Sequence, residues 1–285
     1  MKVVECSRDA MQGIEAFIPT ADKVRYLNQL LKVGFDVIDF GSFVSPKAIP
    51  QMKDTSTVIS QLELNKSSIS RLLAIVANTR GAKDACSYDA ISYIGFPLSI
   101  SETFQRRNTN KSIPEALNEL GAIRDVCSRT GKQLVVYISM GFGNPYGDPY
   151  HADLVTSFVD IVQTLGADTI SLADTVGVST PKTIHDLFTS IRTTFPKADL
   201  GVHLHSTAGS TLEKIEAAYR AGCTRLEGAL RGYGGCPMAD DELIGNLATE
   251  QIVSFLDSQG VNSSIDKAEL ARALKLADEI FPRHE

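Results

Sequence analysis

The chain has 285 residues, of which 43% are hydrophobic and 22% are charged, so it can form a globular domain with a large core. Its net charge of −6, without any block of lysine and arginine, argues against nucleic acid or a membrane surface as a partner. The five cysteines form no CxxC pair and no long apolar segment occurs, so we expect reduced thiols in an intracellular, cytoplasmic protein.

Short runs rich in Val, Ile, Leu and Phe alternate along the chain with longer amphipathic stretches, which is the pattern of repeated βα units. The runs predict eight strands, over 2–6, 35–42, 70–76, 90–96, 133–140, 169–175, 199–206 and 225–232. Helices are predicted between them, over 20–33, 79–88, 112–130, 150–165, 180–195 and 209–221. Eight units at this length predict an α/β fold, a (β/α)8 TIM barrel that forms one catalytic domain over 1–285, with 240–285 as a C-terminal helical extension.

In a barrel of this kind the polar residues that end the strands meet at one mouth, where active sites lie. Such residues end or follow five of the eight runs, in chain order Arg8, Asp9, Asp39, Asp174, His203 and His205, with Cys236 and Asn246 in the loop after the last. The sequence therefore predicts a polar site at the carboxyl-terminal mouth of the barrel.

The segment HLH, residues 203–205, places two histidines on one face of the seventh strand, because successive side chains alternate between faces. With Asp9 and Asn246 at the same mouth they would offer one carboxylate, two imidazoles and one carboxamide, a ligand set that suits Mg²⁺ or Mn²⁺. Taken singly, each residue also has a plain structural interpretation. The histidines could be core or surface residues, and Asp9 and Asn246 could be helix caps.

Several longer motifs are specific enough to compare with known families. They are Ser7-Arg8-Asp9, SFVSPKAIPQM at 42–52, SLADTVGVSTP at 171–181, HLH at 203–205, and GGCPMA with GNLATE within 234–250. With these motifs the chain resembles 3-hydroxy-3-methylglutaryl-CoA lyase nearly end to end. The Arg-Asp pair and HLH are also similar to the wider superfamily of metal-dependent barrels, which includes isopropylmalate and homocitrate synthases.

The resemblance implies a divalent-metal-dependent lyase, with Mg²⁺ or Mn²⁺, that cleaves 3-hydroxy-3-methylglutaryl-CoA or a close β-hydroxyacyl-CoA to acetyl-CoA and acetoacetate. It implies that Asp9, His203, His205 and Asn246 bind the metal, that Arg8 faces the reacting carbonyl, and that Cys236 is the catalytic thiol. The resemblance leaves the acceptor of the hydroxyl proton open between Asp9 and a histidine, and it implies that Asp9 and His203 are both catalytic.

The resemblance also implies a substrate-binding set, namely the acids Asp39, Asp174 and Glu250 near the site and, in 102–113, Arg106, Arg107 and Asn108 at the coenzyme A end. The segment 102–113 fits a solvated basic loop equally well. We further expect a homodimer.

The chain departs from the family pattern at three places. Ser206-Thr207 follows HLH where the family has Asp-Thr, RDAMQGI stands in place of RDGLQNE, and Arg231 replaces a small residue. These changes predict a lost carboxylate and a gained cation near the site. Two alternatives stay open: a related condensing enzyme or aldolase that acts on 2-oxo acids, and a non-catalytic acyl-CoA-binding homologue.

Overall fold

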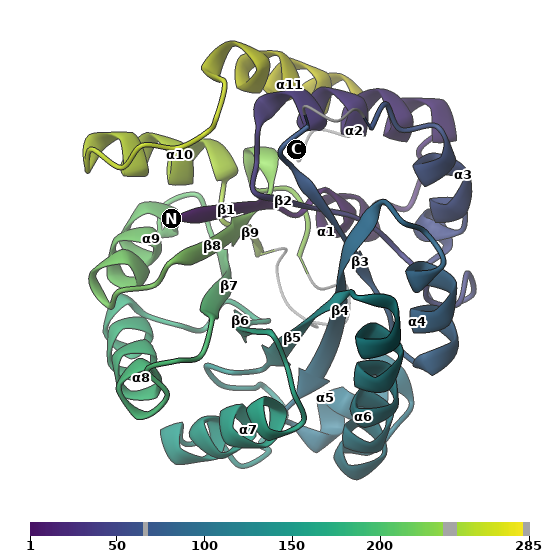
Figure 1. Ribbon diagram of the computed structural model, residues 1–285. Coiled ribbons are helices and arrows are strands. Elements are labelled where there is room, and N and C mark those ends of the chain that lie inside the picture. The colour runs from purple at the N-terminus through teal and green to yellow at the C-terminus, as the bar shows by residue number, and fades with distance from the viewer. Residues whose placement is uncertain (65–67, 236–243, 282–285) are drawn as a thin grey trace.

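The computed structural model describes residues 1–64, 68–235 and 244–281. Eight parallel strands pair in sequence order, and β6 also pairs with β7, so that the sheet closes on itself (Figure 1). The strands are β1 (Lys2–Glu5), β2 (Val37–Ser42), β3 (Arg71–Ile75), β4 (Ile91–Ser99), β5 (Gln133–Ser139), β6 (Thr169–Asp174), β7 (Leu200–Ser206) and β8 (Arg225–Gly228). The predicted TIM barrel is therefore confirmed.

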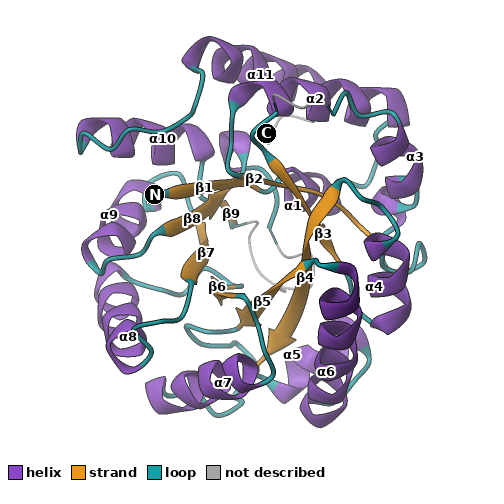
Figure 2. Ribbon diagram, viewed as in Figure 1, coloured by secondary structure: helices purple, strands orange, loops and turns teal. Residues whose placement is uncertain are grey.

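Helices form the outer layer around the strands (Figure 2). Those that follow the eight strands in turn are α2 (Thr20–Val33), α3 (Thr55–Ser60), α4 (Thr79–Cys86), α6 (Ile113–Thr130), α7 (Ala152–Thr164), α8 (Pro181–Thr194), α9 (Thr211–Arg220) and α10 (Thr249–Ser258). Local sequence explains several of their ends. Ser112 and Thr180 form capping boxes at the starts of α6 and α8, and α2 ends at Gly34, whose φ is +89°.

Two short helices lie at the carboxyl ends of strands, where no helix is predicted from the sequence. Helix α1 (Ser7–Gln12) follows β1 directly, and α5 (Glu102–Thr109) follows β4. Ser101 caps α5 by accepting a hydrogen bond from the backbone N–H of Phe104. The segment interpreted as a basic loop is thus helical in its first part.

The C-terminal region divides differently from the prediction. Helix α10 takes the eighth place in the ring, next to α9, so it is part of the barrel (Figure 1). Of the described residues beyond α10, α11 (Lys267–Ile280) is the additional helix, and it packs along α2, where Tyr26 and Phe281 meet edge to face with ring centroids 5.1 Å apart. The part that extends the barrel therefore begins later than residue 240.

Side chains alternate between the two faces of each strand. One face contributes to the layer between strands and helices, and the other fills the barrel with a small apolar cluster made of Val4, Cys6, Val37, Leu73, Ile75, Tyr93, Val135 and Tyr137. Charged side chains share this interior, because Arg225 and Glu227 of β8 are fully buried and bond to each other. Within the described part of the chain, none of the helices has the length and apolar character needed to cross a membrane.

Candidate active site

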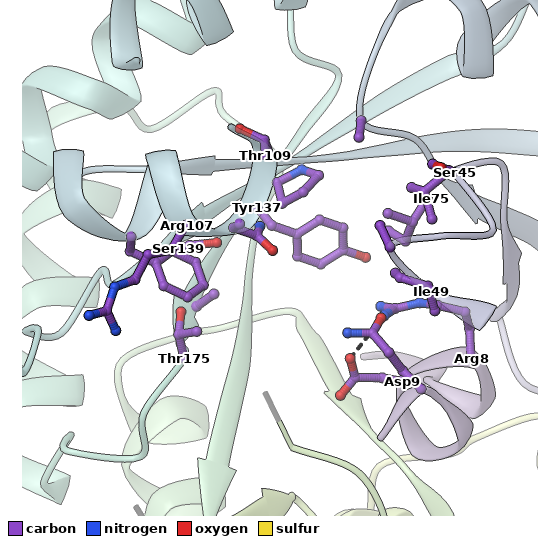
Figure 3. Close-up of a pocket in the computed structure, with 18 of the residues that line it drawn as sticks. Arg8, Asp9, Ser45, Ile49, Ile75, Arg107, Thr109, Tyr137, Ser139 and Thr175 are labelled. Atoms are coloured by element: carbon purple, nitrogen blue, oxygen red, sulfur yellow. Dashed lines mark hydrogen bonds and ion pairs between the residues drawn. The ribbon is translucent and has the colours of Figure 1, made fainter. Parts of the chain in front are cut away.

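A cavity of about 510 Å³ lies at the carboxyl-terminal mouth of the barrel. Its polar end is lined by Arg8, Asp9, Asp39, His203 and His205, all buried. The segment after β2, with Val44, Ala48, Ile49 and Pro50, forms an apolar part of the lining together with Ile75. Figure 3 shows Arg8 and Asp9 beside Ile49 on one side of this cavity, and Arg107, Ser139 and Thr175 on the other.

Helix α1 presents Arg8 to the cavity and fixes its orientation. The guanidinium donates from Nε and Nη2 to Asp39 Oδ2 at 3.0 and 2.8 Å, and from Nη1 to Asp9 Oδ1 at 3.0 Å (Figure 3). Ser7 donates its hydroxyl to the Asp39 carbonyl, which ties α1 to β2. Arg8 is therefore a fixed cation held between two carboxylates.

Burial and charge act on these groups in opposite directions. Burial disfavours the charged form of Arg8, but the Asp39 and Asp9 carboxylates outweigh it and raise the pKa of Arg8. Burial raises the pKa of Asp39 to about 6, although Arg8 acts against the shift. For Asp9, burial acts to raise the pKa, but Arg8, the two histidines and the hydrogen bond from Asn246 together outweigh it, so the pKa is lowered. Asp9 is thus the more firmly ionised of the two acids.

Asp9, His203, His205 and Asn246 converge at this mouth. The Nε2 atoms of His203 and His205 are 3.3 Å apart, and Asp9 Oδ2 lies 3.9 Å from His205 Nε2. The two-residue strand β9 (Gly245–Asn246) pairs antiparallel with β7 and sets Asn246 opposite His205. There its Nδ2 donates to Asp9 Oδ2 at 2.7 Å. All four predicted ligands therefore lie together.

The hydrogen bonds around this cluster leave acceptor atoms free. His205 Nδ1 lies 3.0 Å from the Thr175 carbonyl, and since a carbonyl only accepts, Nδ1 carries the proton and Nε2 keeps its lone pair. Burial and then His203 lower the pKa of His205 to about 4, so this ring is neutral. Asn246 Oδ1 is buried without a hydrogen-bond partner among the described residues. A carboxylate, an imidazole lone pair and an unpaired amide oxygen in one place fit a divalent cation.

Of the three residues predicted to bind the coenzyme A end of the substrate, two line the cavity and one does not. Arg107 and Asn108 of α5 line the cavity, and the Arg107 guanidinium lies 4.8 Å from the centre of the Tyr146 ring. Arg106 is not part of the lining, and its Nε pairs with Glu102 Oε1 at 2.8 Å on the exposed side of the helix. The cavity is therefore reached by two of the three.

Asp174 and Glu250, predicted near the substrate, do not line the cavity. Asp174 Oδ2 accepts from Lys214 Nζ at 3.0 Å, and the same ammonium donates to the His205 carbonyl at 2.7 Å. Glu250 accepts from the backbone N–H of Arg231 at 3.1 Å. Asp174 supports the end of β7 from behind, and Glu250 supports the turn after β8.

The departures from the family pattern do not place a new charge in the cavity. The Arg231 side chain leaves the site and donates to both carboxylate oxygens of Asp278 on α11, at 2.9 and 2.7 Å. Ser206 is buried and bonds Thr211 Oγ1 at 2.7 Å. The expectation of a gained cation near the site is therefore wrong. Cys236, the predicted catalytic thiol, lies outside the described residues.

Among the residues that the sequence does not predict at the site are Tyr137 and Glu227, which both lie beside His203. Tyr137 of β5 lines the cavity, and its buried hydroxyl has no hydrogen-bond partner in the part of the chain that the structure describes. Glu227 of β8 is buried beneath His203. Burial would raise its pKa, but the Arg225 guanidinium and His203 lower it to about 2. The sequence feature that could have indicated both residues is a polar side chain within an apolar strand segment.

Comparison with known proteins places the chain in a family. The HMGL-like family model matches residues 4–277. The chain is similar to the hydroxymethylglutaryl-CoA lyase YngG of Bacillus subtilis, with 31% identity over 95% of this chain and 90% of that protein. The mitochondrial hydroxymethylglutaryl-CoA lyase of Mus musculus is 32% identical over 96% of this chain and 83% of its own length.

Solved structures agree with this placement. The HMG-CoA lyase of Brucella melitensis has a TM-score of 0.90 and 29% identity, and covers 98% of this chain and 97% of its own. An HMG-CoA lyase of Acinetobacter baumannii, solved in complex with coenzyme A and 3-methylmalate, has a TM-score of 0.91 and 30% identity, over 98% of this chain and 90% of its own. The chain therefore belongs to the HMGL-like family.

Proposed function

We propose that the protein is a divalent-metal-dependent lyase that splits 3-hydroxy-3-methylglutaryl-CoA into acetyl-CoA and acetoacetate. The observation that carries the proposal is the meeting of Arg8 with Asp9, His203, His205 and Asn246 at one cavity. The relatives named hydroxymethylglutaryl-CoA lyase support the reaction, and the Acinetobacter baumannii complex with coenzyme A supports an acyl-CoA ligand.

The four converging residues would hold the cation. Asp9, His203, His205 and Asn246 supply the oxygen and nitrogen atoms that Mg²⁺ or Mn²⁺ accepts, and Asn246 Oδ1 is otherwise unpartnered among the described residues. When bound, such an ion supplies Lewis acidity, which polarises substrate oxygens and favours loss of the hydroxyl proton.

The reaction moves one proton from oxygen to carbon. The C3 hydroxyl loses its proton, the C2–C3 bond breaks to give acetoacetate and the enolate of acetyl-CoA, and C2 of the enolate is then protonated. Asp9, which lines the cavity at its polar end, would take the hydroxyl proton. His203, the other candidate, has no free lone pair for this proton while its Nε2 binds the cation. Cys236 would return a proton to C2, since a thiol of ordinary pKa is a workable acid at neutral pH.

Arg8 would stabilise the charge that develops on the thioester oxygen. Its guanidinium is already oriented by Asp9 and Asp39, so little reorganisation is needed during the reaction. Arg107 and Asn108 line the far part of the same cavity, where they would hold the coenzyme A end. The cavity thus has one end where the reaction would take place and another that would bind coenzyme A.

The test is an assay of purified protein with 3-hydroxy-3-methylglutaryl-CoA, first with EDTA and then with added Mn²⁺ or Mg²⁺. We expect acetyl-CoA and acetoacetate in equal amounts, only with the metal present. Condensation of acetyl-CoA with a 2-oxo acid would assign the chain to a synthase instead. Binding of acyl-CoA without turnover would make it a non-catalytic homologue. The homodimer and the cytoplasmic location remain predictions, and light scattering and cell fractionation would test them.

A further inference from the structure

A buried carboxylate lies directly beneath the predicted metal site. Glu227 of β8 is 0% exposed, and its Oε1 accepts from Arg225 Nε at 3.0 Å and from Ser171 Oγ at 3.1 Å. These two hydrogen bonds orient the Glu227 carboxylate, and both are accepted by the same oxygen, Oε1. The other oxygen, Oε2, is turned toward β7 and lies 3.4 Å from His203 Nδ1.

The two nitrogens of His203 therefore face different partners. Nδ1 faces the Glu227 carboxylate, and Nε2 faces His205 Nε2, 3.3 Å away, on the side of Asp9. A carboxylate can only accept a hydrogen bond, so the nitrogen that faces it carries the hydrogen. In a neutral ring this leaves the lone pair on Nε2, the nitrogen that faces the other predicted ligands.

The second neighbour of Nδ1 is a weaker candidate for the same role. Cys6 Sγ lies 3.9 Å from His203 Nδ1 and donates to Glu227 Oε2, also at 3.9 Å. A thiol that donates to the carboxylate leaves the carboxylate as the acceptor for the imidazole N–H. Glu227, and not Cys6, is therefore the group that can select one tautomer.

We propose that Glu227 is a positioning residue for metal binding: its carboxylate, held by Arg225 and Ser171, keeps His203 in the Nδ1–H tautomer and turns Nε2 toward Asp9, His205 and Asn246. The inference rests on the metal site of the proposed function, but not on which substrate is cleaved. Partners of this kind in other metalloproteins change metal affinity ten- to a hundredfold when mutated. Arg225 and Glu227 would then serve the site as well as the barrel core.

The first experiment compares Mn²⁺ binding to metal-free wild type and to Glu227→Gln by isothermal titration calorimetry. We expect the dissociation constant to rise about ten- to a hundredfold in the variant. Glu5→Gln is the matched control, because Glu5 is also a fully buried carboxylate, on neighbouring β1, but bonds the Leu230 N–H and the Thr249 hydroxyl. The control should bind Mn²⁺ within about twofold of wild type, and so should Cys6→Ala.

A merely structural role for Glu227 would lower the unfolding midpoint and leave the Mn²⁺ affinity of the folded variant unchanged. That result would overturn the proposal, as would equal losses of affinity in Glu227→Gln and Glu5→Gln. Failure of wild type to bind Mn²⁺ would overturn it together with the metal-dependent function. If wild type binds Mn²⁺ with the expected difference between variants but leaves 3-hydroxy-3-methylglutaryl-CoA intact, the proposed function fails and this inference stands.

A second measurement needs no variant and decides the matter if Glu227→Gln does not fold. The ¹⁵N spectrum of metal-free wild type, labelled at histidine and recorded at mildly alkaline pH, reports which ring nitrogen of His203 carries hydrogen before any cation binds. We expect a protonated Nδ1 and an unprotonated Nε2. Hydrogen on Nε2 with a bare Nδ1 would show that Glu227 does not select the tautomer.

Discussion

Arg8 is the residue at which shape matters as much as charge. Its planar guanidinium donates hydrogen bonds to two carboxylates at once, through Nε and Nη2 to Asp39 and through Nη1 to Asp9. A lysine ammonium is a single point charge and cannot bridge both acids in the same geometry. The orientation of the cation is therefore specific to arginine.

We expect Arg8→Lys to lower kcat about a hundred- to a thousandfold, the loss that follows removal of one preorganised donor. Steady-state kinetics with saturating Mn²⁺ would measure the effect, and circular dichroism would check the fold. A near-normal kcat in this variant would mean that Arg8 holds α1 against β2 and does not act on substrate.

Two asparagines of the site, Asn246 and Asn108, should differ in what their substitution changes. Asn246 lies among the predicted ligands, with a buried Oδ1 that lacks a partner among the described residues, whereas Asn108 lines the cavity on α5. Asn246→Ala should weaken Mn²⁺ binding tenfold or more, because a ligand is lost. Asn108→Ala should leave Mn²⁺ binding unchanged and raise KM for the acyl-CoA. Calorimetry with Mn²⁺ and kinetics together would measure both, and equal metal affinities would contradict the assignment of Asn246.

At the scale of single elements, β1 carries a buried acid that affects stability. Burial raises the pKa of Glu5 to about 8, well above its ordinary value, even though the Thr249 hydroxyl and the Leu230 N–H lower it. The folded state therefore binds a proton that the unfolded chain has already released. Stability from this group is complete below about pH 4.5 and is lost as the pH rises through 8.

Metal-free wild type should thus lose free energy of unfolding between pH 5 and pH 8, and Glu5→Gln should lose less, because its amide does not titrate. Part of the loss should remain in the variant, since burial raises the pKa of Asp39 as well. Urea unfolding at several pH values would measure the difference. Parallel curves for the two proteins would show that Glu5 has an ordinary pKa in the folded state.

The turn after β8 carries a strained residue that also forms an ion pair. Arg231 has a φ of +63°, and its side chain, 40% exposed, pairs with Asp278 of α11. Exposed pairs contribute about 0–1 kcal/mol, while left-handed backbone costs a residue with a Cβ about 1–2 kcal/mol. Arg231→Gly should therefore be close to wild type in stability, and Arg231→Ala about 0.5–1 kcal/mol less stable than the glycine variant. Thermal unfolding of the three proteins would test this order.

The sequence predicts the regular elements better than the short ones. Long apolar runs such as 133–140, flanked by amphipathic stretches, indicate buried strands, and eight such units favour a closed barrel over a doubly wound sheet. Helices α1 and α5 are short and polar, and β9 has two residues, so their structure depends on contacts with distant strands. Such contacts leave no local pattern in the sequence.

The same limit explains the site. His203 and His205 are evident because their spacing alone puts them on one face, and the loop motifs point to Asn246. Glu227 and Tyr137 gain meaning only when closure of the barrel turns them toward the histidines. The family resemblance predicts Asp174 near the substrate, and the sequence does not reveal that Lys214 pairs with Oδ2 of its carboxylate.

For the whole molecule, the hydrogen bond between Asn246 of β9 and Asp9 of α1 joins the beginning of the chain to its last part. Asn246 donates to Asp9 across 237 positions of sequence, and β8 closes against β1 beside them. A cation held by both residues would close a loop that contains almost the entire barrel. The site can therefore exist only after the last strand has been placed.

The bound ion would then stabilise the pairing between β8 and β1, the seam at which the barrel closes. Opening the barrel there separates Asn246 from Asp9 and costs the binding free energy of the metal in addition to the strand pairing. Added Mg²⁺ should slow amide hydrogen exchange most at Val3, Val4 and Leu226 along this seam, and least at the seam between β4 and β5, which carries no ligand. Mass spectrometry of exchanged peptides with and without Mg²⁺ would measure the contrast. Asn246→Ala keeps both histidines and the seam but lacks the amide ligand, so it should gain less of this protection.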